Sequence, residues 1–252
     1  MDRKFIIRIY PDAIALCRAA AEHFVNRANE FATAKGRFNV LLSGGSTPKG
    51  MFALLAGEKE LHDAVPWKDI HFFWGDERHV PPDHPDNNYK MAEEILLSKV
   101  PVDREHVHRV ISEVSDAYLS AANYEIELKQ YIHVLDGGFP RFDLVFLGMG
   151  PDGHTASLFP GTKALDEESK WVVANWVGKL YTWRITLTAP VINHAAEVVF
   201  LVGGDDKAQP LKAVFEGPHE PAQLPAQLIH PVNGELIWMV DAKAASLLKT
   251  SV

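Results

Sequence analysis

Short apolar runs alternate with helix-like segments along almost the whole chain, and this alternation limits the possible folds more than any other feature. Eight runs have the length and composition of strands: Phe5–Tyr10, Phe38–Leu42, Ile70–Trp74, Phe142–Leu147, Trp171–Trp176, Arg184–Leu187, Val198–Val202 and Leu236–Val240. Strands that alternate with helices favour a mainly parallel sheet. We therefore expect an α/β fold with a Rossmann-like sheet, covered by helices on both faces, in one domain over residues 1–252.

The first helices can be placed from their start signals. Pro11-Asp12 should open a long helix whose apolar face includes Cys17 and Phe24, which recur at helical spacing. Thr47 should cap a second helix, because Pro48 suits the first turn.

The remaining helices and loops follow from periodicity and from proline content. Helices are expected near Tyr89–Ser98, over Asp116–Leu135 and after Asp241, and the stretch Thr155–Leu158 can begin another. The proline-rich segment Gly75–Asn88 should be a loop without regular structure. The segment Gly217–Pro231 should be a loop with one helical turn and not a domain linker.

Charge and cysteine content limit the class of function. A formal net charge of −8 without a basic run argues against a nucleic-acid partner. No apolar stretch approaches a membrane span, and Arg8 interrupts the run behind Arg3 and Lys4, which argues against a signal peptide. The single cysteine, Cys17, excludes an internal disulfide and is expected to pack in the core. A cytoplasmic enzyme or binding protein is therefore expected.

The loop after the second predicted strand, Ser43–Pro48, has the composition of a phosphate cradle. Gly44 and Gly45 let successive backbone N–H groups face an anion, and the hydroxyls of Ser46 and Thr47 can add donors at the start of a helix. It is not a P-loop, because Met51-Phe52 stand where Lys-Ser/Thr is needed. A plain strand-to-helix turn is the alternative.

The segment Gly148–Pro160 carries the most specific chemistry. It follows a predicted buried strand, and three glycines in six residues let the backbone turn sharply beside a ligand. Asp152 and His154 lie on that turn, where open α/β sheets place their reactive groups. The glycine spacing formally matches a dinucleotide fingerprint, but it occurs late in the chain and Asp152 would repel a pyrophosphate. A structural histidine remains the alternative for His154.

Charged residues stand at two other predicted strand ends. Asp76 or Glu77 could handle protons and Arg78 could hold an anion, with a solvated loop of internal ion pairs as the alternative. Arg184 opens an apolar strand, and Lys207 lies in the first turn of a helix, where a cation opposes the helix dipole. Both are candidates for binding an anionic ligand, with plain surface charges as the alternative.

A metal centre is not expected. Prolines separate the histidines and aspartates of the loop after the third strand, and no ligand spacing is recognisable among His79, Asp83, His84 and Asp86. A single cysteine also excludes a thiolate zinc site.

Five blocks together resemble the signature blocks of 6-phosphogluconolactonase, in the same order: Leu42–Pro48, Trp74–Arg78, Asn88-Tyr89, Gly148–Pro160 and Arg184–Thr188. The resemblance covers nearly the whole chain. It implies hydrolysis of 6-phospho-D-glucono-1,5-lactone to 6-phospho-D-gluconate, the second step of the oxidative pentose phosphate pathway. It also implies that no metal, nucleotide or other cofactor is needed.

Lactone hydrolysis suggests a role for each candidate residue. The reaction needs a deprotonated water, a stabilised oxyanion and a protonated ring oxygen. His154 would be the general base, and Asp152 would orient it or stabilise its cation. Arg78 would stabilise the oxyanion or clamp the substrate, and Asp76 is a second candidate carboxylate. The phosphate would be held by Gly44, Gly45, Ser46, Thr47, Arg184 and Lys207.

Glucosamine-6-phosphate isomerase/deaminase shares several of these blocks and is the nearest rival. It has a catalytic glutamate where this chain has Phe159 and a tyrosine where this chain has Arg78, so both differences favour the lactonase. Two departures from the lactonase pattern concern the rim of the substrate site. Asn87 replaces the usual serine, and Leu180–Trp183 replaces a proline-rich segment.

Two further classes of function stay open. A non-catalytic sugar-phosphate sensor would need Arg184 and Lys207 but no Asp–His pair, and an oxidoreductase would need to bind a nicotinamide dinucleotide. We expect a small-molecule sugar-phosphate lactone as the partner, no nucleic acid or membrane, and a monomer.

Overall fold

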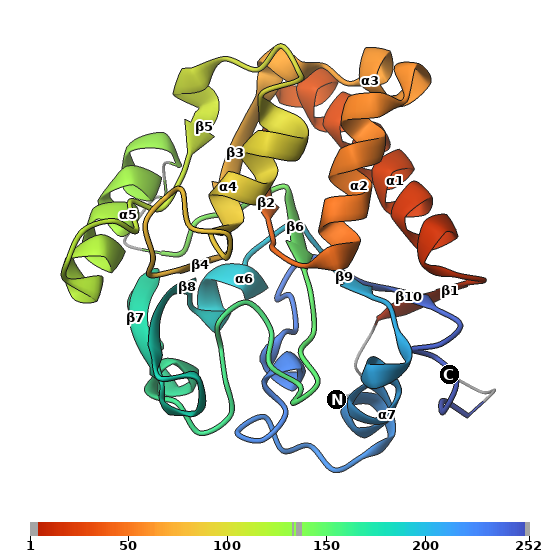
Figure 1. The fold of residues 1–252 in the computed structure, drawn as a ribbon, viewed down its shortest axis with the longest axis vertical. Coiled ribbons are helices and arrows are strands. Elements are labelled where there is room, and N and C mark those ends of the chain that lie inside the picture. The colour runs from red at the N-terminus through yellow and green to blue at the C-terminus, as the bar shows by residue number, and fades with distance from the viewer. Residues whose placement is uncertain (1–4, 133, 135–137, 250–252) are drawn as a thin grey trace.

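A parallel sheet of seven strands forms the centre of the computed structural model, which describes residues 5–132, 134 and 138–249 (Figure 1). Its order is β1-β10-β9-β6-β2-β3-β5, and all its pairings are parallel. The strands are β1 Ile6–Tyr10, β2 Phe38–Leu42, β3 Ile70–Trp74, β5 Val107–His108, β6 Leu144–Leu147, β9 Glu197–Val202 and β10 Glu235–Asp241. The predicted α/β fold with a mainly parallel sheet is confirmed.

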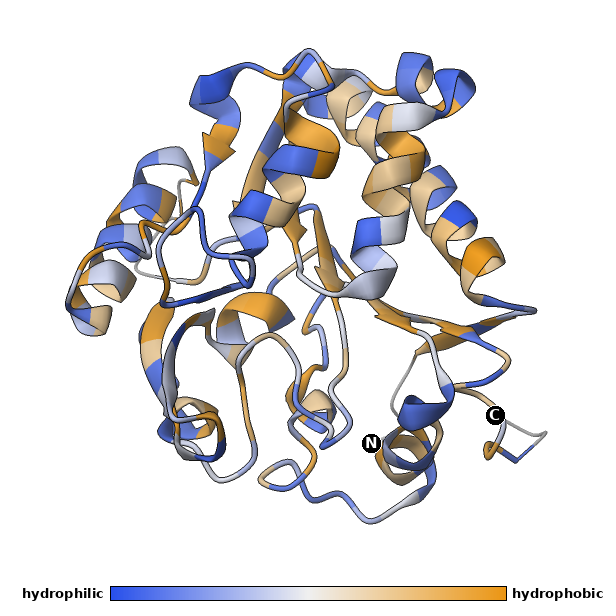
Figure 2. Ribbon diagram, in the orientation of Figure 1, coloured by the Kyte–Doolittle hydropathy of each residue, from blue (hydrophilic) through white to orange (hydrophobic). Residues whose placement is uncertain are grey.

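Central strands are buried on both faces, which explains why they read as continuous apolar runs. All residues of β2, β6 and β9 are buried. Figure 2 shows these strands as hydrophobic segments between helices that carry hydrophilic outer positions. β5 has only two residues, too few to give a periodic signal, and the sequence did not predict it.

Helices cover both faces of the sheet. They are α1 Ala13–Lys35, α2 Ser46–Gly57, α3 Lys59–Ala64, α4 Asn88–Ala92, α5 Ala117–Tyr131, α6 Ala189–Asn193 and α7 Ala208–Glu216. Phe24 of α1 packs on Phe146 of β6, with ring centroids 6.5 Å apart. Phe215 of α7 packs on Trp238 of β10 at 4.9 Å. Trp238 and Leu147 are both register partners of Phe200 in β9, so their side chains point to the same face of the sheet. Phe146 is adjacent to Leu147 in β6 and therefore points to the other face. Helices α1 and α7 thus cover opposite faces.

A second, antiparallel sheet corrects the sequence prediction. Its order is β4-β8-β7, with β4 Asp76–Arg78, β7 Val172–Val177 and β8 Thr182–Leu187. We expected the last two in the parallel sheet and expected no regular structure after Gly75. Gly75 separates β3 from β4 and joins the sheets, since its N–H donates to Leu42 and its carbonyl accepts from Leu187. A short strand as polar as β4 has no recognisable periodicity.

Several local predictions need correction at turns. Gly45, with φ of +108°, is the N-cap of α2, so Thr47 lies inside the helix that it was expected to cap. Thr155–Leu158 closes a tight bridge instead of starting a helix. The segment after Asp241 forms turns and not a helix in its described part. The loop Gly217–Pro231 does contain the predicted helical turn, at Pro225–Leu228.

The other helix predictions hold within a few residues. α4 begins at Asn88 and continues as a π-helical turn over Glu93–Leu97. α5 begins after its cap, Asp116; the predicted end at Leu135 lies outside the described residues, as do Arg3 and Lys4. On α1, Cys17 is half-buried, with its Sγ 3.5 Å from the carbonyl of Thr47. Among the described helices, none has both the length and the apolarity to cross a bilayer.

Candidate active site

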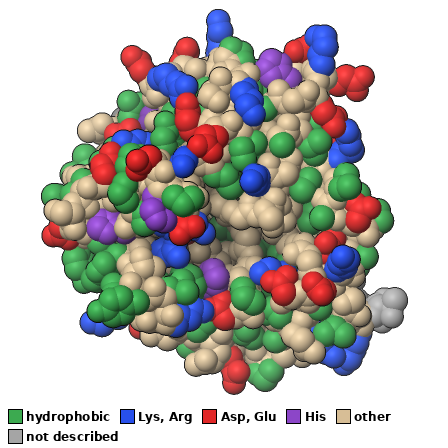
Figure 3. Space-filling model, viewed as in Figure 1, with side chains coloured by type: hydrophobic (Ala, Val, Ile, Leu, Met, Phe, Trp, Pro, Cys, Tyr) green, Lys and Arg blue, Asp and Glu red, His purple; other side chains and the backbone are tan. Residues whose placement is uncertain are grey.

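Loops from several neighbouring strands meet at the carboxyl edge of the large sheet. They follow β2, β4, β6 and β9. Of these strands, β9, β6 and β2 are consecutive neighbours in the large sheet. Figure 3 shows a hollow in the middle of this face, with basic, acidic and histidine side chains around it. It contains a cavity of about 260 Å³ that we call the loop compartment, lined by Ser43–Pro48, Asp76, Arg78, Gly148–Pro151, His154, Lys207 and neighbouring residues.

The glycine loop is shaped by close packing against α4. A Cβ on Gly44 would lie 2.1 Å from Oδ1 of Asn88, so a side chain there would displace that amide. Asn88 is buried and donates from Nδ2 to the carbonyl of Asp76 at 3.0 Å, which connects the glycine loop to β4. The predicted phosphate cradle therefore lines the cavity at the start of α2, whose amino-terminal dipole favours an anion.

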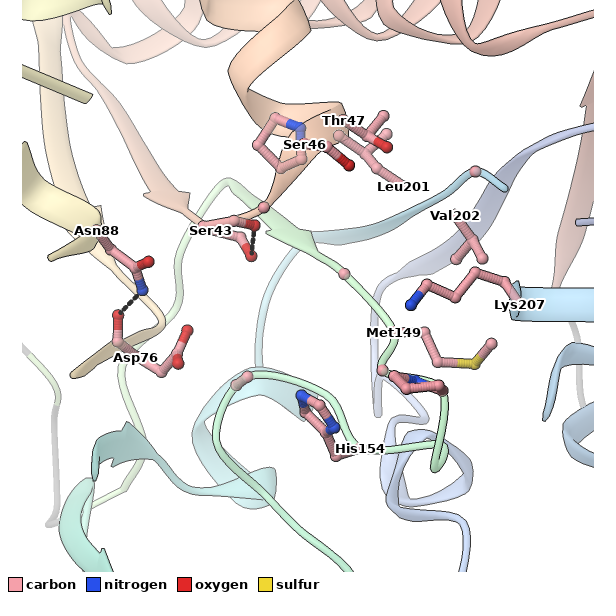
Figure 4. A pocket seen from close by; sticks show the side chains of 18 of the residues that line it. Ser43, Ser46, Thr47, Asp76, Asn88, Met149, His154, Leu201, Val202 and Lys207 are labelled. Atoms are coloured by element: carbon pink, nitrogen blue, oxygen red, sulfur yellow. Dashed lines mark hydrogen bonds between the residues drawn. The ribbon is translucent and has the colours of Figure 1, made fainter. Parts of the chain in front are cut away.

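His154 and Asp152 are held together by the glycine turn. Nδ1 of His154 contacts Oδ1 of Asp152, and the N–H of Gly150 donates to the carbonyl of His154 at 2.8 Å. A Cβ on Gly150 would lie 2.0 Å from Nδ1 of His154, so only glycine leaves room for the imidazole. Gly153, at a φ of +74°, completes the turn. Figure 4 shows the imidazole pointing into the cavity, with Lys207 reaching in from another side.

The surroundings of His154 favour its neutral form. Burial lowers the pKa of His154 to about 4; Lys207, Arg184 and Arg78 act in the same direction and Asp76 opposes them. The ring of Phe159 stacks on the imidazole, with centroids 4.0 Å apart. A histidine that is neutral at pH 7 can accept a proton, which is the property that a general base needs.

The two adjacent carboxylates of β4 have different surroundings. Asp76 lines the cavity and accepts a hydrogen bond from the Ser157 hydroxyl at 2.6 Å. Glu77 is completely buried and accepts from the N–H groups of Arg78, Asn88 and Tyr89. Burial raises the pKa of Glu77 to about 7, against the effect of these three donors. Of the two candidates, Asp76 lines the cavity, whereas Glu77 holds the start of α4.

A second cavity of about 470 Å³ adjoins the first, and we call it the arginine compartment. It is lined by Phe159, Lys179, Leu180, Arg184 and others, and it shares Asp76, Arg78, Pro151, His154 and Ala156 with the loop compartment. The structure thus divides the predicted phosphate ligands: the glycine loop and Lys207 line one compartment, and Arg184 lines the other. The Lys207 ammonium is paired with Asp206 at 2.8 Å.

Both arginines of the small sheet have unused hydrogen-bonding capacity. The Nε atoms of Arg78 and Arg184 are buried without a partner among the described residues. Burial, followed by the charge of Arg78, lowers the pKa of Arg184. Arg78 donates from one terminal nitrogen to the carbonyl of Asp86 at 2.6 Å, which ties the loop after β4 to the site. Buried donors of this kind suit an anionic ligand.

Lys179 and Ala156 contact or line the site but were not predicted from the sequence, whereas Asn87 was predicted at the substrate rim and does not line it. Lys179 pairs with Asp152, although its segment between β7 and β8 has no motif that announces it. Ala156 borders both compartments at a φ of +48°, a strained conformation that often occurs at functional sites. Of the two rim departures, Leu180 lines the arginine compartment, whereas the buried Asn87 caps α4 and lines neither compartment.

The described residues contain no group of three or more His, Cys, Asp or Glu side chains that could hold a metal ion. In the candidate site the imidazole of His154 contacts the carboxylate of Asp152, and cationic side chains line the compartments around them: Arg78, Arg184 and Lys207. A buried imidazole among cations can activate water next to a bound anionic substrate.

Comparisons with known proteins agree with this geometry. The sequence matches the family of glucosamine-6-phosphate isomerases/6-phosphogluconolactonase over residues 11–238. It is 40% identical over 246 residues to 6-phosphogluconolactonase of Nostoc sp., covering 97% of this chain and 99% of that protein. The Synechocystis sp. 6-phosphogluconolactonase is 43% identical over 216 residues, covering 85% and 86%. The 6-phosphogluconolactonase from Trypanosoma cruzi has a TM-score of 0.85 at 29% identity, covering 99% and 98%. This chain therefore belongs to the glucosamine-6-phosphate isomerase/6-phosphogluconolactonase family.

Proposed function

We propose that this protein hydrolyses 6-phospho-D-glucono-1,5-lactone to 6-phospho-D-gluconate. The observation that carries the proposal is the contact between His154 and Asp152 at a cavity bordered by Arg78 and Lys207. The names of the relatives support the same activity. Phe159 supports it against the deaminase, because an apolar ring lies against the imidazole where that reaction needs a carboxylate.

His154 is the general base of the proposed mechanism. Its Nδ1 is occupied by Asp152, so Nε2 takes a proton from water while the water oxygen bonds to the lactone carbonyl carbon. The carbonyl oxygen becomes an oxyanion, and Arg78, which lines both compartments, supplies a candidate donor for it. When the bond between that carbon and the ring oxygen breaks, the proton on His154 passes to the ring oxygen. The product is the open-chain acid, and His154 is neutral again.

The 6-phosphate is assigned to the junction of the two compartments. From one side it can be reached by Gly44, Gly45, Ser46, Thr47 and Lys207, and from the other by Arg184. Arg78 borders both compartments. Binding a phosphate remote from the reacting carbon positions the carbonyl against His154, which lowers the entropic part of the barrier.

The two carboxylates have separate proposed roles. Asp152 touches the imidazole, so it orients His154 and stabilises the cation that forms during the reaction. Asp76 accepts from Ser157 and faces the space between the compartments, where it helps to place the attacking water.

A coupled assay tests the proposal. Fresh lactone is supplied by glucose-6-phosphate dehydrogenase, and its disappearance is compared with spontaneous hydrolysis at the same pH. Acceleration proportional to protein concentration is the expected result. Binding of 6-phosphogluconate without acceleration would instead favour a sugar-phosphate sensor, and a nicotinamide-dependent thermal shift would favour an oxidoreductase.

The cellular setting forms part of the proposal. A single cysteine and a net charge of −8 suit a cytoplasmic enzyme that acts on a small anion without a cofactor. A monomer suffices, because one chain supplies all the proposed groups. Size-exclusion chromatography with light scattering checks the oligomeric state.

A further inference from the structure

Lys179 is the outer member of a chain of contacts that leads to His154. Its ammonium pairs with Oδ2 of Asp152, and Oδ1 of the same carboxylate contacts Nδ1 of His154. Lys179 lies in the short turn Gly178–Leu180 between β7 and β8, whereas the other two lie on the loop after β6. The small sheet thus provides one member of a group that otherwise belongs to the large sheet.

Phe159 closes the chain into a ring of contacts. The Nζ atom of Lys179 lies 4.9 Å from the centroid of the Phe159 ring, and that ring stacks on the imidazole of His154. Lys179 therefore touches both groups that flank His154, the carboxylate at Nδ1 and the aromatic ring against its face. A cation over a ring face is itself a favourable contact.

We infer that Lys179 is a positioning residue for His154, acting through Asp152 on the orientation and the basicity of the imidazole. The inference rests on the proposed role of His154 as general base. A carboxylate held only by His154 can rotate about its χ2 angle, whereas one with both oxygens engaged presents a fixed acceptor to Nδ1. The fixed acceptor keeps the proton on Nδ1 and leaves Nε2 free for water.

The charge of Lys179 also controls how readily His154 is protonated. An unneutralised Asp152 stabilises the imidazolium, and a lysine on its other oxygen weakens that effect. The other charged groups that face His154 come from β4, β8 and the turn before α7, and a substitution of Lys179 does not alter their side chains: Asp76, Arg78, Arg184 and Lys207. Loss of Lys179 should therefore raise the pKa of His154.

The test compares Lys179→Met with Lys179→Arg and with a matched lysine outside the site. The Lys179 side chain is 50% exposed, so its replacement removes little packing. Lys163, an exposed residue that lines neither compartment, provides the control Lys163→Met. We expect Lys179→Met to lower kcat by about 5- to 50-fold, because small misplacements in a site can cost up to about 10²-fold. KM should stay within about twofold, since the interaction acts on chemistry and not on binding.

The pH profile separates positioning from a merely structural role. In Lys179→Met the acid limb of kcat/KM should move upward by roughly one pH unit, as expected for the loss of one partly screened charge. Lys179→Arg should restore most of both properties, and Lys163→Met should match the parent. Parental kcat and pH profile in Lys179→Met would overturn the inference. Weaker binding of 6-phosphogluconate with an unchanged profile would also overturn it, because Lys179 would then hold the substrate directly.

A direct titration keeps the inference testable without turnover. In an NMR titration of the His154 ring, the pKa should be higher in Lys179→Gln than in the parent. Equal pKa values in the two proteins would contradict the inference. Thermal unfolding confirms that the variants are folded. Failure of the proposed function would give a different result, because the unmodified protein itself would then not hydrolyse the lactone faster than the spontaneous rate.

Discussion

Arg78 and Arg184 lie directly opposite each other, as register partners on the antiparallel strands β4 and β8. Like charges at such positions destabilise a sheet pair. Both Nε atoms are buried and have no hydrogen-bond partner within the described part of the chain, which adds to this cost. An anion near the pair would offset both costs, so we interpret the pair as part of the binding site for the substrate and not as scaffold alone.

The first prediction concerns that anion. Arg184→Ala and Lys207→Ala should each weaken binding of 6-phosphogluconate by about 1.5–3 kcal/mol, the usual loss for a charged hydrogen bond. Isothermal titration measures this, with Lys163→Ala as a control that should bind like the parent. If only one variant is affected, the phosphate lies in that residue's compartment. If neither is affected, it lies elsewhere in the molecule.

The second prediction concerns the base. His154→Ala should lose about 10²–10⁴ in turnover, the usual contribution of positioned proton transfer. Product affinity should change little, because the proposed phosphate ligands remain. Steady-state kinetics with the lactone and titration with the product check the two statements. The exposed His230→Ala serves as a control. Turnover within a few-fold of the parent would remove His154 from its assigned role.

The third prediction follows from the pKa of His154, which burial lowers to about 4. The base must be neutral to accept a proton, so kcat/KM should be nearly constant from about pH 5.5 to 7 and should fall tenfold per unit only below about pH 4. An unperturbed histidine would lose activity from about pH 6.5 downward. Initial rates in this range, corrected for spontaneous hydrolysis, separate the two cases. Returning acid-treated enzyme to pH 7 controls for unfolding.

The fourth prediction concerns the rival activity. The deaminase must open a sugar ring, move a proton between carbons and expel ammonia, and Phe159 cannot transfer protons. No ammonia should be released from glucosamine 6-phosphate above background. Phe159→Glu alone should not install the activity, because Arg78 still differs from the rival's tyrosine and several groups must be placed together. Stoichiometric ammonia from the unmodified protein would reverse the choice between the two reactions.

The fifth prediction concerns Glu77 as a structural residue. Glu77→Gln replaces an acceptor oxygen by an NH₂ group that faces backbone donors, which should lower the free energy of unfolding by about 1–3 kcal/mol. Urea denaturation measures the change. Glu113→Gln breaks a partly exposed pair with Arg109 and should cost at most about 1 kcal/mol. An unchanged midpoint for Glu77→Gln would show that its three hydrogen bonds do not stabilise the start of α4.

The sequence by itself determined the parallel sheet and the loops that meet at its edge. Buried parallel strands require continuous apolar runs, and their carboxyl ends converge wherever the strands are neighbours. Residues that follow β2, β6 and β9 could therefore be assigned to one site before their contacts were known. The glycines were equally informative, since Gly150 leaves the space that the imidazole of His154 fills.

Only the tertiary structure decided which residues share a sheet and which charges face each other. β7 and β8 read as apolar runs like the others, but their antiparallel pairing with β4 depends on contacts between distant segments. The different contacts of Asp76 and Glu77 and the pairing of Lys179 with Asp152 arise from the same long-range packing. Local periodicity reports which side of an element is buried, whereas the partner of a charge depends on where the whole chain brings its neighbours.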